Sequence, residues 1–320
     1  MTWFAQLFCR VSALMLMWCL PSLALEGYRA ELNIPFSTVD GKTLTMNAFL
    51  PEQAERPAPA MVYFYGGWWF GGGAAGKIED VPGWDNFTKR GAAVFSNQYR
   101  LGREGGFPQN IRDCRNAIRY IRQHAKEFNI DPERIACTGI SAGGYLTYMV
   151  TLAPEDFDDG GATKGLEGVS ARVCGGFGYV GPTDFVDAWE RSPDDTVSAD
   201  GEKKHRPPDN NIYNDYRPRL RILFHGMTPE TEAGRMLYAR MSPVNLARKG
   251  TPPLLIGDGE KDLIVPFQPG RVLHEKLRAA DADAVYWMTP GGGHGYPGGR
   301  GFQEVLNDFL NRIWQPAQSK

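Results

Sequence analysis

Short apolar runs alternate with helical patterns along most of this chain, and that alternation limits the folds that the chain can adopt. Uninterrupted apolar runs are typical of strands buried on both faces of a parallel sheet; they occupy residues 60–65, 92–96, 134–138, 173–179, 254–257 and 284–288. We predict helices in residues 84–90, 111–128, 143–152, 269–279 and 302–314. An opening hairpin is predicted from residues 28–35 and 44–50 around the turn at Asp40 and Gly41. The pattern therefore indicates the α/β class, with a mostly parallel central sheet and helices on both faces.

One stretch does not follow this alternation. Residues 154–249 contain a single clear strand run, while residues 158–168 and 191–219 are rich in Asp, Gly, Pro, Asn and charged side chains. A long irregular stretch inside a compact domain is usually a functional loop. We therefore expect one domain over residues 25–320, with a lid-like insertion at about 154–249. The alternative is a solvated surface excursion without a role in function.

The first residues have the pattern of a secretory signal peptide. Arg10 precedes an apolar run over residues 11–20, and the small residues Ser22 and Ala24 follow it. The run is shorter than the roughly 20 residues that cross a bilayer, although an uncleaved anchor is the alternative. We expect cleavage after residue 24, a secreted or periplasmic protein, and no stable membrane insertion afterwards.

Charge and cysteine content exclude several classes of function. The chain has 35 Lys and Arg against 37 Asp and Glu, for a net charge of −2, and nucleic-acid-binding proteins usually carry a basic surplus. Past residue 24 the cysteines are Cys114, Cys137 and Cys174, an odd number without a C-x-x-C pair. This pattern favours neither a disulfide framework nor a zinc site, and we expect no metal.

A G-x-S-x-G motif spans Gly139 to Gly143 and has Ser141 at its centre. An apolar strand run precedes it and a helical pattern follows, which is the strand–turn–helix setting of a nucleophile elbow. That turn is tight, so bulky residues are excluded two positions to either side of the serine. Ser141 is the predicted nucleophile, and a plain glycine-rich turn is the alternative.

The predicted base is His294. The chain has five histidines; the others are His124 and His274 in helical patterns and His205 and His225 in the irregular stretch. His294 stands among glycines just after the last strand run, where the backbone can bring an imidazole close to another loop. Its place after the serine also matches the chain order Ser, acid, His. The alternative is a surface-loop histidine.

The acid that orients this histidine is expected after residues 254–257. Asp258, Glu260 and Asp262 are the three carboxylates there. Asp262 is preferred because it directly precedes the apolar residues 263–265; Asp258 and Glu260 stay open as alternatives. A carboxylate in this role fixes the imidazole tautomer and stabilises its positive charge.

A glycine-rich aromatic loop follows the strand run at 60–65. Glycines there expose amide groups to a substrate oxygen, so the expected oxyanion donors are the amides of Gly67 and Trp68, with that of Ala142 after the serine. Trp68, Trp69 and Phe70 follow the first glycines, and one of these rings is expected to wall the acyl side of a substrate pocket; Trp69 and Phe70 are the expected substrate-binding residues. The alternative is that these rings fill the core beneath the loop.

These pieces resemble the α/β-hydrolase superfamily, and more closely its hormone-sensitive-lipase-like esterases and its feruloyl- and acetylxylan-esterase-like group. The resemblance covers most of residues 25–320 and rests on YGGWWFGG, NQYRL, DPERI, GISAGG, GPTDF, DGEKDLIVP and GGGHG. Two positions depart from the family pattern: Tyr65 stands where a histidine is usual, and Trp68 where a small residue is common. Arg100 and Asp113 are expected to form ion pairs.

The resemblance implies the α/β-hydrolase fold and a secreted serine carboxylic-ester hydrolase without a cofactor. Small-molecule or polysaccharide esters carrying acetyl or feruloyl groups are the implied substrates, and nucleic acid is not an expected partner. One alternative is an amide hydrolase such as a formamidase or small peptidase, because the triad does not choose between ester and amide. The other is a non-catalytic carbohydrate- or protein-binding module on a hydrolase scaffold.

Overall fold

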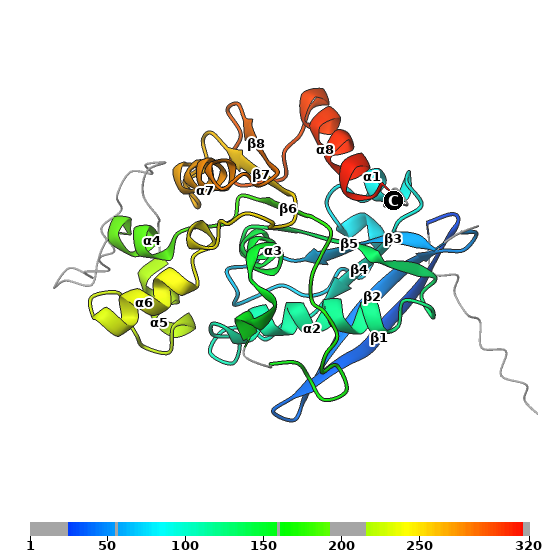
Figure 1. Ribbon diagram of the computed structural model, residues 1–320, viewed down its shortest axis with the longest axis horizontal. Coiled ribbons are helices and arrows are strands. Elements are labelled where there is room, and N and C mark those ends of the chain that lie inside the picture. Colours follow the sequence, from blue (N-terminus) through cyan, green and yellow to red (C-terminus); the bar gives the residue numbers. More distant parts are fainter. Residues whose placement is uncertain (1–24, 55–56, 159–160, 193–215, 316–320) are drawn as a thin grey trace, which may run out of the picture.

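An eight-stranded sheet organises the protein, in the order β1-β2-β4-β3-β5-β6-β7-β8 (Figure 1). The computed structural model describes residues 25–54, 57–158, 161–192 and 216–315, so the expected signal segment lies outside the described residues. The strands are β1 (Tyr28–Val39), β2 (Lys42–Pro51), β3 (Ala58–Phe64), β4 (Ala93–Asn97), β5 (Ile130–Ile140), β6 (Gly176–Tyr179), β7 (Leu254–Gly259) and β8 (Ala284–Thr289).

The sheet is antiparallel at one edge and parallel elsewhere. β1 pairs with β2 and β2 with β4 in antiparallel register, whereas every pair from β4 to β8 is parallel. All residues of β3 are buried, as a strand covered on both faces requires. The edge strand β1 is mostly exposed along its first part, and its register shifts between Glu31 and Ile34 and again between Pro35 and Ser37.

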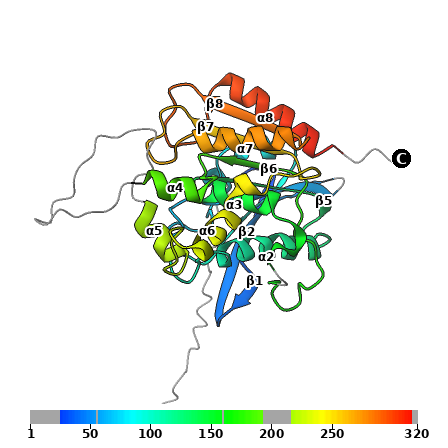
Figure 2. The same ribbon diagram turned by 60° about the vertical axis from the view of Figure 1, so that its left-hand side comes forward.

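Helices cover both faces of the sheet. Successive residues of β6 point to opposite faces: Phe177 contacts Phe302 of α8 (Arg300–Ile313), while Gly178 lies against Tyr148 of α3 (Ala142–Leu152). α1 (Trp84–Thr88) packs beside α8 through the rings of Phe87 and Trp314. α2 (Gln109–Gln123) and α7 (Gln268–Ala279) flank α3 on its face (Figure 2). The predicted α/β fold with a mostly parallel sheet and helices on both faces is confirmed.

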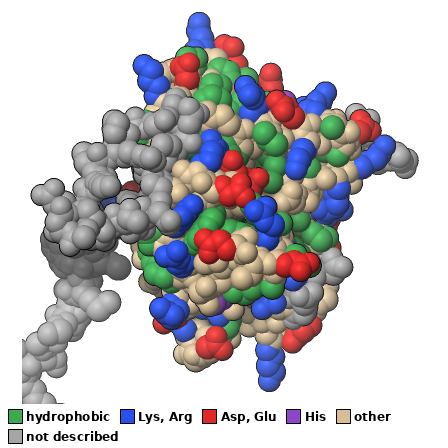
Figure 3. Space-filling view, turned by 90° about the vertical axis from the view of Figure 1, so that its left-hand side faces the viewer, with side chains coloured by type: hydrophobic (Ala, Val, Ile, Leu, Met, Phe, Trp, Pro, Cys, Tyr) green, Lys and Arg blue, Asp and Glu red, His purple; other side chains and the backbone are tan. Residues whose placement is uncertain are grey.

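The stretch expected to be irregular contains helices. α4 (Phe185–Arg191), α5 (Tyr216–Leu223) and α6 (Glu232–Arg240) lie together at one end of the molecule (Figure 1). The side chain of Asp184 caps α4 and that of Thr231 caps α6, and both accept backbone N–H bonds. Acidic and basic side chains are interspersed on this end of the surface (Figure 3). The expectation of an irregular insertion is therefore wrong for these three segments; residues 193–215 lie outside the described residues.

Two further features bear on the sequence predictions. Cys114 and Cys137 are buried and free, and burial raises the pKa of the Cys137 thiol to about 12, so they serve as small core residues.

Within the described ranges, no helix combines the length and apolar character needed to cross a membrane.

Candidate active site

Ser141 occupies a strained turn between β5 and α3. Its φ of 55° and ψ of −120° are unfavourable for a residue with a side chain. A Cβ on Gly143 would lie 2.7 Å from the carbonyl oxygen of Tyr65 and closer still to that of Phe64, and a Cβ on Gly139 would lie 2.7 Å from the Phe64 oxygen. The two motif glycines are therefore required by close packing against the end of β3, as a nucleophile elbow demands.

The glycine-rich loop lies directly beside this serine. A Cβ on Gly66 would be 3.3 Å from the Ser141 Cβ. The carbonyl of Gly67 accepts hydrogen bonds from the amides of Phe70 and Gly71, each at 3.0 Å, which closes a tight turn. Trp68 and Trp69 within that turn both have left-handed backbones, with φ of 60° and 63°. The close approach of Gly66 to Ser141 places this loop next to the Ser141 turn.

The three expected oxyanion donors have amides available for such a role. Gly67 and Trp68 donate to no backbone carbonyl in the described part of the chain. Ala142 is the first residue of α3, where an amide has no acceptor within its helix. The positive end of the α3 dipole adds to the attraction for a negative oxygen at this point.

His294 and Asp262 are joined by a short hydrogen bond. The Nδ1 of His294 lies 2.7 Å from the Oδ2 of Asp262, whose side chain is fully buried. The other carboxylate oxygen, Oδ1, accepts the amides of Ile264 at 2.8 Å and Val265 at 3.0 Å. The carboxylate is thus held by its own loop and presents one oxygen to the imidazole, while the Nε2 of His294 remains for another partner.

The acid loop and the histidine loop are packed against each other. Lys261 donates its amide to the Gly292 carbonyl at 2.7 Å, and Glu260 donates its amide to the Thr289 carbonyl at 3.2 Å. The Glu260 carboxylate accepts the amide of Gly291 at 2.6 Å. These bonds can form because β7 and β8 are neighbouring parallel strands, so that the loops after them leave the sheet at the same edge. They hold Asp262 and His294 at a fixed separation.

The two alternative acids have other surroundings. Glu260 is exposed and holds the Gly291 amide, and Asp258 is buried inside β7. Burial raises the pKa of Asp258 well above its usual range, which disfavours the charged form that stabilises an imidazolium. The structure therefore selects Asp262 among the three carboxylates as the partner of His294.

The other described histidines lie in other surroundings. His124 stacks on Tyr120 and bonds the carbonyl of that residue, and His274 lies within α7 and packs near Tyr286 of β8. His225 is an exposed residue after α5, next to Gly106. His205 lies outside the described residues.

Parallel strands bring these loops to one edge. Ser141, Asp262 and His294 follow β5, β7 and β8, and the carboxyl ends of parallel strands meet at the same edge of a sheet. An open depression of about 230 Å³ at this edge is lined by His294, Tyr296 and neighbouring residues of the histidine loop. The predicted nucleophile, base and acid thus belong to one edge of the molecule.

The aromatic residues of the loop divide between core and surface. Trp69 is 1% exposed and makes edge contacts with the rings of Phe107, Tyr145 and Phe185. Its predicted role as a pocket wall is therefore wrong, and the ring fills the core, which was the stated alternative. Phe70 is 38% exposed and lies over the turn at Gly102.

Trp68 is half-buried and contacts the insertion, which the sequence prediction did not include in the site. Tyr216 of α5 meets the Trp68 ring edge-on at 5.0 Å, and the Arg219 guanidinium lies 4.2 Å above it. Burial raises the pKa of Tyr216 well above its usual range, and the charge of Asp262 adds to the rise. One helix of the insertion therefore lies beside the glycine-rich loop and near Asp262. The helical spacing of Tyr216, Leu220 and Leu223 was the signal available in the sequence.

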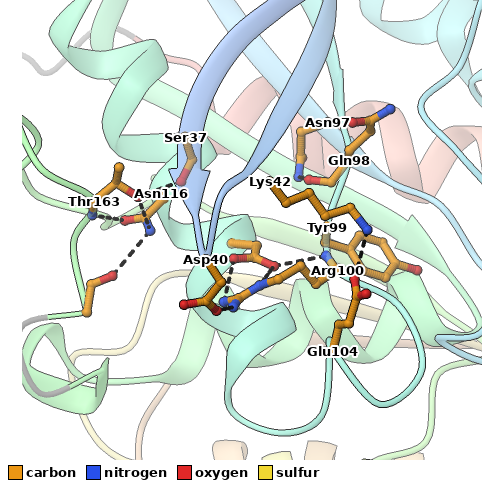
Figure 4. A network of polar contacts seen from close by, with 12 residues as sticks. Ser37, Asp40, Lys42, Asn97, Gln98, Tyr99, Arg100, Glu104, Asn116 and Thr163 are labelled. Carbon is orange, nitrogen blue, oxygen red and sulfur yellow. Dashed lines mark hydrogen bonds and ion pairs between the residues drawn. The ribbon is translucent and has the colours of Figure 1, made fainter.

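The expected ion pair of Arg100 and Asp113 is confirmed. The guanidinium donates to both carboxylate oxygens, and the Arg100 amide donates to Oδ2 at 2.9 Å. Figure 4 shows Arg100 reaching Asp40 as well, at 3.1 Å, while Lys42 contacts Glu104 nearby. The buried pair of Arg100 and Asp113 anchors the chain just after β4 to α2, while Asp40, Lys42 and Glu104 are exposed.

Comparison with known proteins gives one family match. A family model described as BD-FAE matches residues 46–277. Carboxylesterase NlhH of Mycobacterium tuberculosis is 30% identical over 270 residues, which cover 83% of this chain and 76% of that protein. Esterase LipC of the same organism is 26% identical over 243 residues, covering 75% of this chain and 54% of that protein. The chain thus spans about half the length of LipC.

Solved structures give the same fold. A truncated carbohydrate esterase from gut microbiota superposes with a TM-score of 0.72 over 91% of this chain and 98% of that chain, at 24% identity. A thermophilic esterase from Thermogutta terrifontis with bound butyrate gives a TM-score of 0.66 over 92% and 97%, at 26% identity. Both likenesses extend over nearly the whole of the compared chains.

Proposed function

Because this chain belongs to the BD-FAE family of α/β-hydrolase carboxylic ester hydrolases, we propose that it cleaves short-chain or carbohydrate-linked acyl esters through an acyl-enzyme on Ser141. The observation that carries the proposal is the 2.7 Å bond between His294 Nδ1 and Asp262 Oδ2 at the edge where the Ser141 turn also lies. A buried carboxylate on Nδ1 leaves Nε2 to act as a base.

In the first half of the proposed reaction, the Ser141 hydroxyl attacks the ester carbonyl carbon and His294 Nε2 takes its proton. The Asp262 carboxylate stabilises the imidazolium that forms. The carbonyl oxygen becomes negative, and the amides of Gly67, Trp68 and Ala142 donate to it. His294 then gives the proton to the leaving alcohol, and the acyl group remains on Ser141.

In the second half, water replaces the alcohol. His294 removes a proton from the water, which attacks the acyl carbon, and the same amides hold the oxygen. Collapse of the intermediate releases the carboxylic acid and returns the proton to Ser141. Apart from the ester and the water, every reacting group belongs to the chain, and His294 accepts one proton and returns it in each half of the reaction.

The substrate class is supported by the relatives. One similar structure is described as a carbohydrate esterase, and another holds butyrate. The signal pattern in residues 1–24 favours a substrate outside the cytoplasm, so acetyl or feruloyl groups on polysaccharide are the proposed natural esters. A secreted or periplasmic location belongs to the same proposal.

Turnover of p-nitrophenyl acetate and butyrate by the purified protein tests the reaction, with p-nitroacetanilide as the matched amide. We expect ester hydrolysis that Ser141→Ala abolishes. Ser170→Ala, which changes an exposed serine bonded to Glu155, should retain it. Faster cleavage of the anilide than of the acetate would favour an amide hydrolase, and no cleavage of either would favour a binding module.

A further inference from the structure

Tyr65, which stands where the family usually has histidine, forms a reciprocal pair with Tyr99. The two rings stack with centroids 4.4 Å apart and planes inclined by 16°. The Tyr99 hydroxyl donates to the Tyr65 carbonyl at 2.9 Å, and the Tyr65 hydroxyl reaches the Tyr99 carbonyl at 3.5 Å. Both side chains are buried, at 6% and 2% exposure. The pair therefore joins the end of β3 to the segment after β4.

Tyr65 touches both parts of the proposed site. A Cβ on Gly72 would lie 2.5 Å from the Tyr65 ring carbon Cδ2, so the glycine-rich loop rests on this ring. A Cβ on Gly143 would lie 2.7 Å from the Tyr65 carbonyl oxygen, the same oxygen that accepts the Tyr99 hydroxyl. Any displacement of Tyr65 would thus move the oxyanion loop relative to the nucleophile elbow.

Tyr99 has a fixed support of its own. The next residue, Arg100, is bonded through its amide and guanidinium to the buried Asp113 of α2 (Figure 4 shows Tyr99 and Arg100). The side chains of both Arg100 and Asp113 are nearly inaccessible, at 8% and 0%. A continuous series of contacts between buried groups therefore connects α2, through Tyr99 and Tyr65, to the glycine-rich loop.

We propose that Tyr99 is a positioning residue for the oxyanion loop and acts through Tyr65, in the place of the family histidine. The inference rests on the proposed function. Oxyanion donors must lie within a few tenths of an ångström of their best positions, and they act chiefly when the oxygen is negative. Burial raises the pKa of the Tyr65 phenol above its usual range, so its contribution is packing and hydrogen bonding rather than proton transfer.

The test compares Tyr99→Phe with Tyr28→Phe. Tyr28 donates a buried hydroxyl to the Ala92 carbonyl at 3.0 Å, a bond of the same kind outside the site. We expect Tyr99→Phe to lower kcat for p-nitrophenyl butyrate about tenfold with little change in KM, because the loss falls on the transition state. Tyr28→Phe should have the same melting temperature as Tyr99→Phe but keep the kcat of the wild-type protein.

Two more measurements distinguish a positioning role of Tyr99 from a general loss of stability of the fold. The inhibition constant of a boronic acid, which forms a tetrahedral adduct with the serine, should rise in Tyr99→Phe by the factor that kcat/KM falls. Tyr65→Phe keeps the ring under Gly72 and should lose less kcat than Tyr65→Ala. This pair keeps the inference testable if Tyr99→Phe does not fold.

The outcomes distinguish this inference from the proposed function. If wild type is active and Ser141→Ala is not, but Tyr99→Phe keeps its kcat, the positioning role is refuted and the esterase remains. An equal fall of kcat in Tyr28→Phe, or a rise in KM alone, also refutes it. If the wild type cleaves no ester, the proposed function itself has failed.

Discussion

The backbone of Gly259 is in close contact with Gly292, in the loop that carries His294: a Cβ on Gly259 would be 2.7 Å from the carbonyl oxygen of Gly292 and closer still to that of Gly293. Gly259 ends β7, and the histidine loop follows β8, so this contact sets how near Asp262 can come to His294. No side chain larger than a hydrogen fits without moving one of the two loops.

Gly259→Ala should therefore lower ester hydrolysis at least tenfold while the sheet stays folded, because the displaced loops lengthen the bond between Asp262 and His294. Gly298→Ala is the matched control, since a Cβ there meets nothing within 4 Å. Steady-state kinetics and circular dichroism of both variants provide the measurement. Full activity in Gly259→Ala would show that the loops adjust independently of catalysis.

Asp262→Asn should reduce kcat/KM on the order of 10⁴-fold, because an amide neither fixes the required imidazole tautomer nor stabilises the imidazolium. The backbone bonds from Ile264 and Val265 can persist to the amide oxygen, so the fold should remain. Asp258→Asn, an identical change in the same strand-end region, should keep the activity. Comparable losses in the two variants would contradict the choice of Asp262.

Asp258 also makes stability depend on pH. Its folded pKa is raised by burial, so the native state holds a proton that the unfolded state loses as pH rises above the ordinary value of about 4. The free energy of unfolding should fall with rising pH from that value up to the raised pKa. Asp258→Asn should remove this slope and exceed wild type in stability at neutral pH. Urea titrations at pH 4, 6 and 8 measure it; parallel curves for both proteins would contradict the prediction.

The two tryptophans of the glycine-rich loop should differ on mutation. Trp69→Ala should cost about 3–5 kcal/mol of unfolding free energy and lower activity on all acyl lengths alike, because its ring is buried in the core. Trp68→Ala should cost less and shift preference from acetyl and butyryl toward octanoyl esters. Values of kcat/KM over an acyl series, with a melting curve for each variant, decide this. An unchanged preference in Trp68→Ala would remove that ring from the acyl site.

The sequence predicted the sheet and the site loops because their signals are local. β3 is apolar throughout and every residue is buried, and the glycines around Ser141 are required by contacts that the motif implies. α5 was missed because Pro218 and three arginines obscure the stripe of Tyr216, Leu220 and Leu223 that faces inward. Proline and closely spaced charges disfavour a helix in the sequence pattern, but the packing of these three apolar side chains against the rest of the protein stabilises it.

The directions of neighbouring aromatic rings needed the tertiary structure. Trp68 and Trp69 are adjacent, and both have a left-handed backbone that sequence propensity disfavours, so the ring that enters the core was not predictable. The Tyr65–Tyr99 pair likewise depends on β3 and β4 being neighbours in parallel register. Sequence alone gives two tyrosines at separate strand ends.

The irregular register of β1 has a consequence for self-association. A free sheet edge offers unpaired amides and carbonyls to a strand of another molecule, which is a route to aggregation. In β1 the hydrogen-bond ladder is interrupted twice, Asn33 has a left-handed backbone at φ 59°, and Pro35 lacks an amide hydrogen. A second chain cannot extend a regular hydrogen-bond ladder along such an edge. The strand that carries the exposed apolar side chain of Leu32 is therefore a poor site for the addition of a strand from another molecule.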